Sequence, residues 1–268
     1  MTRHGLVNQT DTSAAALIVV PKPDFDTWRS NQSQLLRDWL ESIRFSGDAG
    51  ALTWLPPAAD GGTRVLVVTG NDPLTAIADL PFRLPVGGYR LESALSGTER
   101  ELAMLGWGLG AYRFTRYKKA ERVPATLDTG SPIEPALRQL DAITLVRDLI
   151  NTPAADMLPS DLANESEALA ARFDARCEIT VGDALLAENF PTIHAVGRAS
   201  TNAPRLIDIR WGKEGDPALV LIGKGVCFDS GGLDIKGAAN MRFMKKDMGG
   251  AAHALGLAQL VMANGLPV

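Results

Sequence analysis

Short apolar runs alternate with amphipathic helical patterns along this chain. The runs at residues 16–20 and 65–69 have the length and the β-branched content of buried strands. Apolar residues recur at helical spacing over residues 28–43 and again over about 91–106. Strands that alternate with helices are typical of an α/β domain, so we predict that the first part of the chain forms one.

The composition suits a folded, water-soluble protein with no polyanionic partner. Apolar residues make up 46% of the chain and charged residues 22%, and the formal net charge is -4. This acidic balance makes nucleic acid an unlikely partner. The two cysteines, Cys177 and Cys227, cannot form a disulfide framework, and the longest apolar stretch near the start, 14–20, is too short to span a bilayer. We therefore expect a cytoplasmic protein with no membrane partner.

A turn-rich segment at residues 120–135 separates two parts of the chain. It holds Asp-Thr-Gly-Ser-Pro at 128–132, a composition typical of a linker. A length of 268 residues allows one large or two ordinary domains at roughly 150 residues each. We predict an N-terminal domain over 1–125 and a second domain over 126–268.

The second domain continues the alternation of helices and strands. A helix is expected to follow the start signal at Ser131 and to end at the Asn-Thr-Pro sequence of 151–153. The near-continuous apolar run at 218–222 is typical of a strand buried on both faces, the interior position of an α/β sheet. The remaining predicted elements are helices at 160–173, 183–188 and 249–264, and strands at 177–181 and 206–211.

The chain's densest cluster of Gly, Lys and Asp follows that apolar run. It reads GKGVCFDSGGLDIK over residues 223–236 and continues to DMGGAA at 247–252. A phosphate-binding loop fails on spacing, because the Walker pattern requires a Gly six residues before the Lys and a Ser or Thr after it. Two alternatives stay open: Asp229 and Asp247 pair with lysines at the rim of a sheet, or the carboxylates hold a hard cation.

These segments closely resemble the signature of the leucyl aminopeptidase family, two-metal exopeptidases that include cytosol aminopeptidase. The pair FDSGG and DMGGAA is highly specific. The resemblance is continuous from about residue 105 to the end, whereas residues 1 to about 100 match only in general layout. Further matching segments are GWGLGAYRFTRYK at 106–118, RDLINTP at 147–153, AVGRAS at 195–200 and PRLI at 204–207.

The resemblance implies a metal-dependent aminopeptidase that hydrolyses the N-terminal residue from peptides. Lys224, through a neutral amine, Asp229 and Asp247 would be metal ligands, and Lys236 would be the catalytic lysine that stabilises the developing oxyanion. Two divalent ions, Zn or Mn with Mg or Co as alternatives, would lower the pKa of a bound water. The complete enzyme would also hold bicarbonate, act on peptides with a free N-terminus and assemble as a homohexamer.

One part of the family pattern lies beyond this sequence. The family completes its metal site with a later Asn-Thr-Asp-Ala-Glu-Gly-Arg segment, and the sequence reaches Val268 before any such segment. The fold expected is an N-terminal α/β domain followed by the first part of an α/β catalytic domain with a central mixed, largely parallel sheet. This chain alone is expected to be incomplete for catalysis. The alternatives are a non-catalytic fragment or binding module, and a hydrolase with Cys227 as nucleophile.

Overall fold

The computed structural model describes residues 4–8, 13–58, 61–93 and 95–268. It divides into two compact units, Met1–Leu140 and Asp141–Val268, and the division falls within helix α5 (Glu134–Asn151). Within the described ranges, every helix is too short or too polar to cross a bilayer. The predicted α/β fold class is confirmed, because the first unit is built on a mostly parallel sheet with helices around it.

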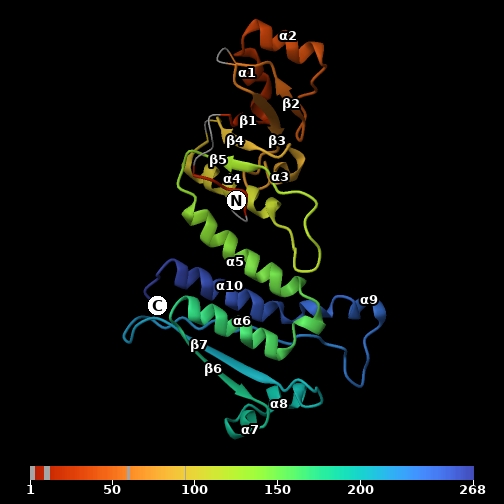
Figure 1. Cartoon of the computed structure of the whole chain (residues 1–268), viewed down its shortest axis with the longest axis vertical. Coiled ribbons are helices and arrows are strands. Elements are labelled where there is room, and N and C mark those ends of the chain that lie inside the picture. The colour runs from red at the N-terminus through yellow and green to blue at the C-terminus, as the bar shows by residue number, and fades with distance from the viewer. Residues whose placement is uncertain (1–3, 9–12, 59–60, 94) are drawn as a thin grey trace. The chain divides into compact units, whose positions relative to one another are not determined.

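The sheet of the first unit has the strand order β2-β3-β1-β4-β5, and β1 lies at its centre (Figure 1). Strand β2 runs antiparallel to β3, and all other neighbours are parallel. In the register of the sheet, Leu17 of β1 lies between Val65 and Leu91. The strands are β1 (Ala15–Pro21), β2 (Leu52–Leu55), β3 (Arg64–Thr69), β4 (Gly88–Leu91) and β5 (Thr126–Asp128).

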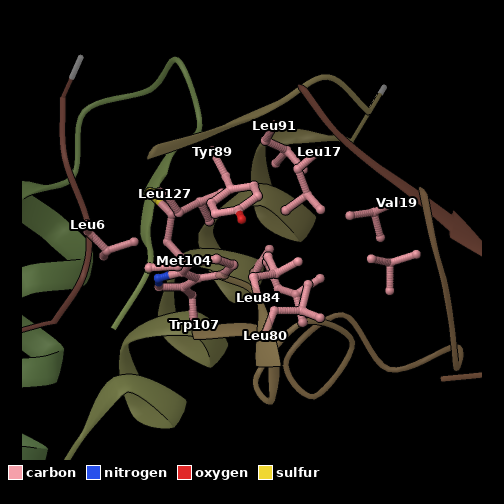
Figure 2. Packing of buried hydrophobic residues seen from close by; sticks show 14 of the residues in the cluster. Leu6, Leu17, Val19, Leu80, Leu84, Tyr89, Leu91, Met104, Trp107 and Leu127 are labelled. Carbon is pink, nitrogen blue, oxygen red and sulfur yellow. The ribbon is translucent and has the colours of Figure 1, made fainter. Parts of the chain in front are cut away.

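Helices cover both faces of this sheet because its central strands are apolar on both sides. Leu17 and Val65 belong to a core that includes Trp107, which is fully buried; Figure 2 shows the packing around that indole. Val20 and Leu66 belong to the core on the other face. Helices α3 (Leu80–Arg83) and α4 (Gly97–Ala111) contribute to the first core. Helices α1 (Phe25–Ser30) and α2 (Gln34–Ser42) contribute to the second core. A short 3-10 helix, η1 (Lys22–Asp24), connects β1 to α1.

The second unit packs α6 (Pro159–Arg172) and α10 (Gly249–Ala263) against an antiparallel pair of strands, β6 (Arg176–Val181) and β7 (Arg205–Arg210) (Figure 1). The core between these layers holds Leu162, Ile207 and Leu255 together with the C-terminal half of α5. The remaining elements are α7 (Ala184–Ala187), α8 (Pro191–Gly197), α9 (Ala238–Met241) and the 3-10 helices η2 (Ala154–Asp156) and η3 (Met244–Met248).

The helix predicted over residues 28–43 is two helices in the structure. Helix α1 ends at Ser30, and the hydroxyl of Ser33 accepts a hydrogen bond from the Leu36 N–H at the start of α2. A serine at that position favours a helix start over helix continuation, because its side chain satisfies a free N–H of the new first turn. Helical spacing of apolar residues continues across the break, which is why the spacing predicted one helix.

The strand predicted at residues 218–222 is wrong. These residues form no strand, and the side chains of Leu219, Val220 and Ile222 are 54%, 75% and 92% exposed. A buried strand needs neighbouring strands and a covering layer, which its own residues do not specify. In the part of the second unit that the structure describes, β6 and β7 pair with each other and no strand lies beside residues 218–222.

Candidate metal and catalytic site

Two main-chain segments cross at the start of α10 and build the candidate site. The N–H of Ala251 donates to the carbonyl oxygen of Lys224 at 2.9 Å. A Cβ at Gly223 would lie 2.4 Å from the carbonyl oxygen of Gly250, and a Cβ at Gly250 would lie 2.8 Å from the nitrogen of Lys224. Glycine at both positions therefore lets the backbones touch. The crossing holds Lys224 beside Asp247, which lies in η3 just before α10.

Lys224 and Asp247 form the first ion pair of the site. Their Nζ and Oδ2 atoms are 2.8 Å apart, and the Asp247 side chain is only 17% exposed. Asp247 Oδ2 is shielded from solvent and, among the described residues, accepts no hydrogen bond of good geometry. The close polar contact with Asp247 and, after it, the attraction of the two charges raise the pKa of Lys224 above its usual value.

Lys236 and Asp229 form the second ion pair. Lys236 Nζ lies 3.1 Å from Asp229 Oδ2, and Asp229 Oδ1 accepts a hydrogen bond from the Gly231 N–H at 2.9 Å. The Gly231 hydrogen bond and the Lys236 ammonium lower the pKa of Asp229 below its usual value. Gly231 has a φ of 91°, which suits glycine, and the turn it makes lets the Lys236 N–H donate to the Ser230 carbonyl at 3.0 Å.

The two ion pairs are linked through Lys224 and Asp229. The charge of Lys224 interacts with Asp229 as well as with its partner Asp247. Among the described residues, no group of three or more His, Cys, Asp and Glu side chains is placed to hold a metal ion. The oxygen donors of the site are thus the two aspartates. Carboxylate oxygens suit hard divalent cations, and the shielded Asp247 Oδ2, which lies 2.8 Å from Lys224 Nζ, would accept such an ion in place of the ammonium charge, so the residues present fit it.

Cys227 is placed as a small buried side chain. It is 7% exposed, it lies in the core of the second unit, and its thiol contacts the Gly225 carbonyl at 3.5 Å. Burial raises the pKa of Cys227 to about 11. The thiol is therefore protonated at neutral pH, which argues against Cys227 as a nucleophile.

Sequence reasoning did not anticipate the main-chain crossing or the support beneath it. Lys245 Nζ donates to the Ile150 carbonyl at 2.8 Å, which ties η3 to the C-terminal end of α5. The signal for the crossing was present in the glycine pair at 249 and 250, which starts a helix and leaves room for a second backbone. The sequence did not indicate which segment would approach it.

Two family models match this chain. The model described as "Cytosol aminopeptidase family, catalytic domain" matches residues 144–268, and the one described as "M17 aminopeptidase, N-terminal domain" matches residues 16–129. All four site residues lie within the region matched by the catalytic-domain model.

Curated proteins and solved structures agree with these matches. The chain is 34% identical over 250 residues to a probable cytosol aminopeptidase of Leifsonia xyli, and 32% identical over 257 residues to one of Nocardia farcinica; the alignments cover 85% and 87% of this chain. A crystal structure of a cytosol aminopeptidase from Coxiella burnetii matches with a TM-score of 0.90 and 38% identity over 98% of this chain. The bottromycin maturation enzyme BotP in complex with Mn matches with a TM-score of 0.77 and 25% identity over 96% of this chain.

The matches differ from this chain in length. The alignments cover 50% and 51% of the Leifsonia and Nocardia proteins, and 58% and 57% of the Coxiella and BotP chains. The chain thus spans about half the length of the curated relatives it matches.

Proposed function

The chain belongs to the cytosol aminopeptidase family, and we propose that it is part of a metal-dependent leucyl aminopeptidase-type exopeptidase that removes the N-terminal residue from peptides. One observation carries this proposal. Two Lys–Asp pairs form one electrostatic cluster, built on a glycine crossing, inside the region that the catalytic-domain model matches. A non-catalytic binding module is not favoured, because the relatives and structures described above are named as enzymes.

We assign metal binding to Lys224, Asp229 and Asp247, and stabilisation of the oxyanion to Lys236. When bound, two divalent cations would lower the pKa of a water between them and hold the α-amine and carbonyl of the substrate. The aspartates supply hard oxygen donors, and Lys224 would act as a ligand only through its neutral amine. Lys236 is oriented by Asp229, and its charge would meet the negative oxygen that develops at the scissile carbonyl.

The cofactor and assembly proposals rest on the family. We propose Zn or Mn as the native ions, with Mg or Co as alternatives and bicarbonate in the complete enzyme; the Mn complex of BotP supports Mn among these. The substrates would be peptides with a free N-terminus, and further copies of the chain would assemble with it into a hexamer. Neither nucleic acid nor a membrane would be a partner. The protein would be located in the cytoplasm. The division into domains at 1–125 and 126–268 stays a prediction.

A metal-binding measurement on the purified 268-residue chain tests whether the Lys–Asp cluster is a cation site or consists of two ion pairs with a structural role only. Isothermal titration with Mn²⁺ should show saturable binding, and Asp247→Asn should weaken it by roughly tenfold or more, because a primary oxygen donor is lost. Asp216→Asn, at a carboxylate outside the cluster, is the matched control and should leave the affinity unchanged. Equal affinity in all three proteins would overturn the assignment of Asp247.

Hydrolysis of Leu-p-nitroanilide tests whether this chain alone is active. We expect little or no release, since the chain spans about half the length of the curated relatives it matches. A high rate that a chelator and Lys236→Ala both abolish would support the assigned chemistry and refute the expectation that this chain is incomplete. Saturable Mn²⁺ binding without hydrolysis is the result we expect.

A further inference from the structure

We propose that the first unit binds a small organic oxyanion, a carboxylate or phosphate that carries an apolar group, in a pocket beside Phe82. This site is separate from the Lys–Asp cluster and does not depend on the function proposed above. The pocket has a volume of about 400 Å³, which lies in the range of small-molecule sites. Its lining combines apolar side chains, such as Val123 and Pro124, with two arginines, Arg113 and Arg122.

The two guanidinium groups converge on one ring. Arg113 Cζ lies 3.6 Å from the centroid of the Phe82 ring, and Arg122 Cζ lies 5.8 Å from the same point. At 3.6 Å the Arg113 guanidinium stacks on the ring, and Arg122 lies within cation–π range of it. Phe82 and both arginines line the pocket, so two cations border it.

Main-chain carbonyls use only part of the donor capacity of these arginines. Arg113 Nη1 donates to the Gly110 and Tyr112 carbonyls at 3.3 and 2.8 Å, and Arg122 Nη2 donates to the Leu84 carbonyl at 2.9 Å. A guanidinium group carries five N–H donors, so each arginine retains donors for a ligand. Paired donors of this kind match the two oxygens of a carboxylate or phosphate.

The two arginines differ in exposure: Arg122 is half-buried and Arg113 is exposed. In the described ranges, no carboxylate lies within ion-pair distance of Arg113 or Arg122, although Arg122 is half-buried. A partly desolvated cation is costly without a partner, and an anionic ligand would supply one. The one acidic side chain of the lining, Glu121, is almost fully exposed and lies 3.7 Å from Lys118.

The chain around the pocket is basic although the whole protein is acidic. Residues 113–122 carry five Lys and Arg and one Glu, whereas the whole chain has a net charge of -4. This local excess of positive charge would draw small anions toward the pocket. The apolar lining then selects anions that carry an apolar group over fully hydrated inorganic ions.

Calorimetric titration of the 268-residue chain at constant ionic strength tests the proposal, with benzoate, phenyl phosphate and inorganic phosphate as probes. At least one of the two aromatic probes should bind saturably and more tightly than inorganic phosphate. Binding of benzoate alone identifies a carboxylate site, and binding of phenyl phosphate alone a phosphate site. Absence of saturable binding for both aromatic probes at concentrations up to about 10 mM would refute the proposal.

Substitutions locate the bound probe. Arg122→Gln and Arg113→Gln should each weaken binding about tenfold or more, because each removes a charged hydrogen-bond donor to the probe. Arg122→Lys keeps the positive charge and loses the planar guanidinium group with its paired N–H donors. It should therefore weaken binding if those paired donors are what recognise the oxyanion. Arg116→Gln removes an equal charge outside the lining and is the matched control. An equal loss in Arg116→Gln would show nonspecific attraction and contradict the site.

Discussion

At the scale of single residues, three glycines of α4 decide how closely the helix can pack. A Cβ at Gly106 would lie 1.9 Å from the carbonyl oxygen of Leu74, and one at Gly110 would lie 1.6 Å from that of Ala78. Gly108 faces the other way, where a Cβ would meet the side chain of Leu140 at 2.2 Å. The helix is therefore in contact with another backbone along the face of Gly106 and Gly110, which lie one turn apart.

Substitution of Gly110 by alanine should destabilise the first unit. The clash is with a main-chain oxygen, which cannot rotate away as a side chain can, so the packing of α4 must shift; overpacking of this kind costs about 1–3 kcal/mol. Denaturant unfolding of Gly110→Ala measures the loss. Gly97→Ala in the same helix is the control, because a Cβ there meets nothing within 4 Å. That control should leave stability nearly unchanged, because Gly97 is the first residue of the helix. Equal stability of the two variants would contradict the contact.

The candidate site shows how far individual residues could be predicted. The grouping of Gly, Lys and Asp pointed to Lys224, Asp229, Lys236 and Asp247 as one chemical cluster, and the structure brings the four together. Which lysine faces which aspartate could not be predicted, because the pairing depends on the crossing of main chains distant in sequence. Spacing alone also could not separate an ion pair from a cation site, since both require the same charges.

At the scale of elements, a reciprocal cap begins α4. The Ser96 hydroxyl accepts a hydrogen bond from the Glu99 N–H at 3.3 Å, and the Glu99 carboxylate accepts one from the Ser96 N–H at 2.8 Å. Both bonds satisfy N–H groups that a helix start leaves without partners. Because α4 carries the glycine face that packs on a neighbouring backbone, its start position also sets that contact.

The cap should make the stability of the first unit depend on pH. The hydrogen bonds from Ser96 lower the pKa of Glu99 below its ordinary value of 4.5. The ionised carboxylate thus stabilises the folded state at pH values above 4.5. This contribution is lost as the pH falls through the lower pKa of the folded state.

Unfolding of Glu99→Gln and of the parent chain as a function of pH checks this dependence. Gln keeps an acceptor for the Ser96 N–H and lacks the charge, so its deficit at neutral pH should shrink in acid. Ser96→Ala should cost about 1 kcal/mol at neutral pH. A constant deficit of Glu99→Gln at all pH values would contradict the role of the carboxylate.

Helices and strands whose own residues carry a clear apolar pattern were predicted from the sequence. Strands that form only by pairing with a neighbouring strand were not. Strands β1 and β3 and helices α6 and α10 have continuous apolar runs or clear helical spacing, and the structure confirms them. The strands β2, β4 and β5 are three or four residues long and take their register from the strand beside them, so their own residues carry too weak a signal. The strand predicted at 218–222 is absent for the same reason, because apolar content alone does not specify burial.

At the scale of the whole molecule, that run is a contiguous apolar surface. Leu219, Val220 and Ile222 are each more than half exposed, and Leu233 and Ile235 are exposed further along the same segment. Contiguous exposed apolar residues promote association, and β-branched residues favour strand pairing between chains. We therefore expect the 268-residue chain to self-associate at high concentration.

Ile222→Lys should reduce this association. An isoleucine that becomes buried contributes about 1.5–3 kcal/mol, so its loss should weaken association roughly tenfold, measured by sedimentation velocity across a concentration series. The unfolding free energy should not fall, because the side chain is 92% exposed. Leu35→Lys, at a leucine 72% exposed on α2, is the control and should leave association unchanged. Similar effects of the two substitutions would show general dependence on surface charge.

The crossing at the candidate site also places a reporter within it. Ala251 is the third residue of α10, where amide protons normally exchange rapidly with solvent deuterium because no carbonyl of the same helix accepts them. Here the Ala251 amide is bonded to the Lys224 carbonyl, so it can exchange only when the two backbones separate. The protection factor of this single amide therefore measures how often the backbone at Lys224 separates from the start of α10 in solution.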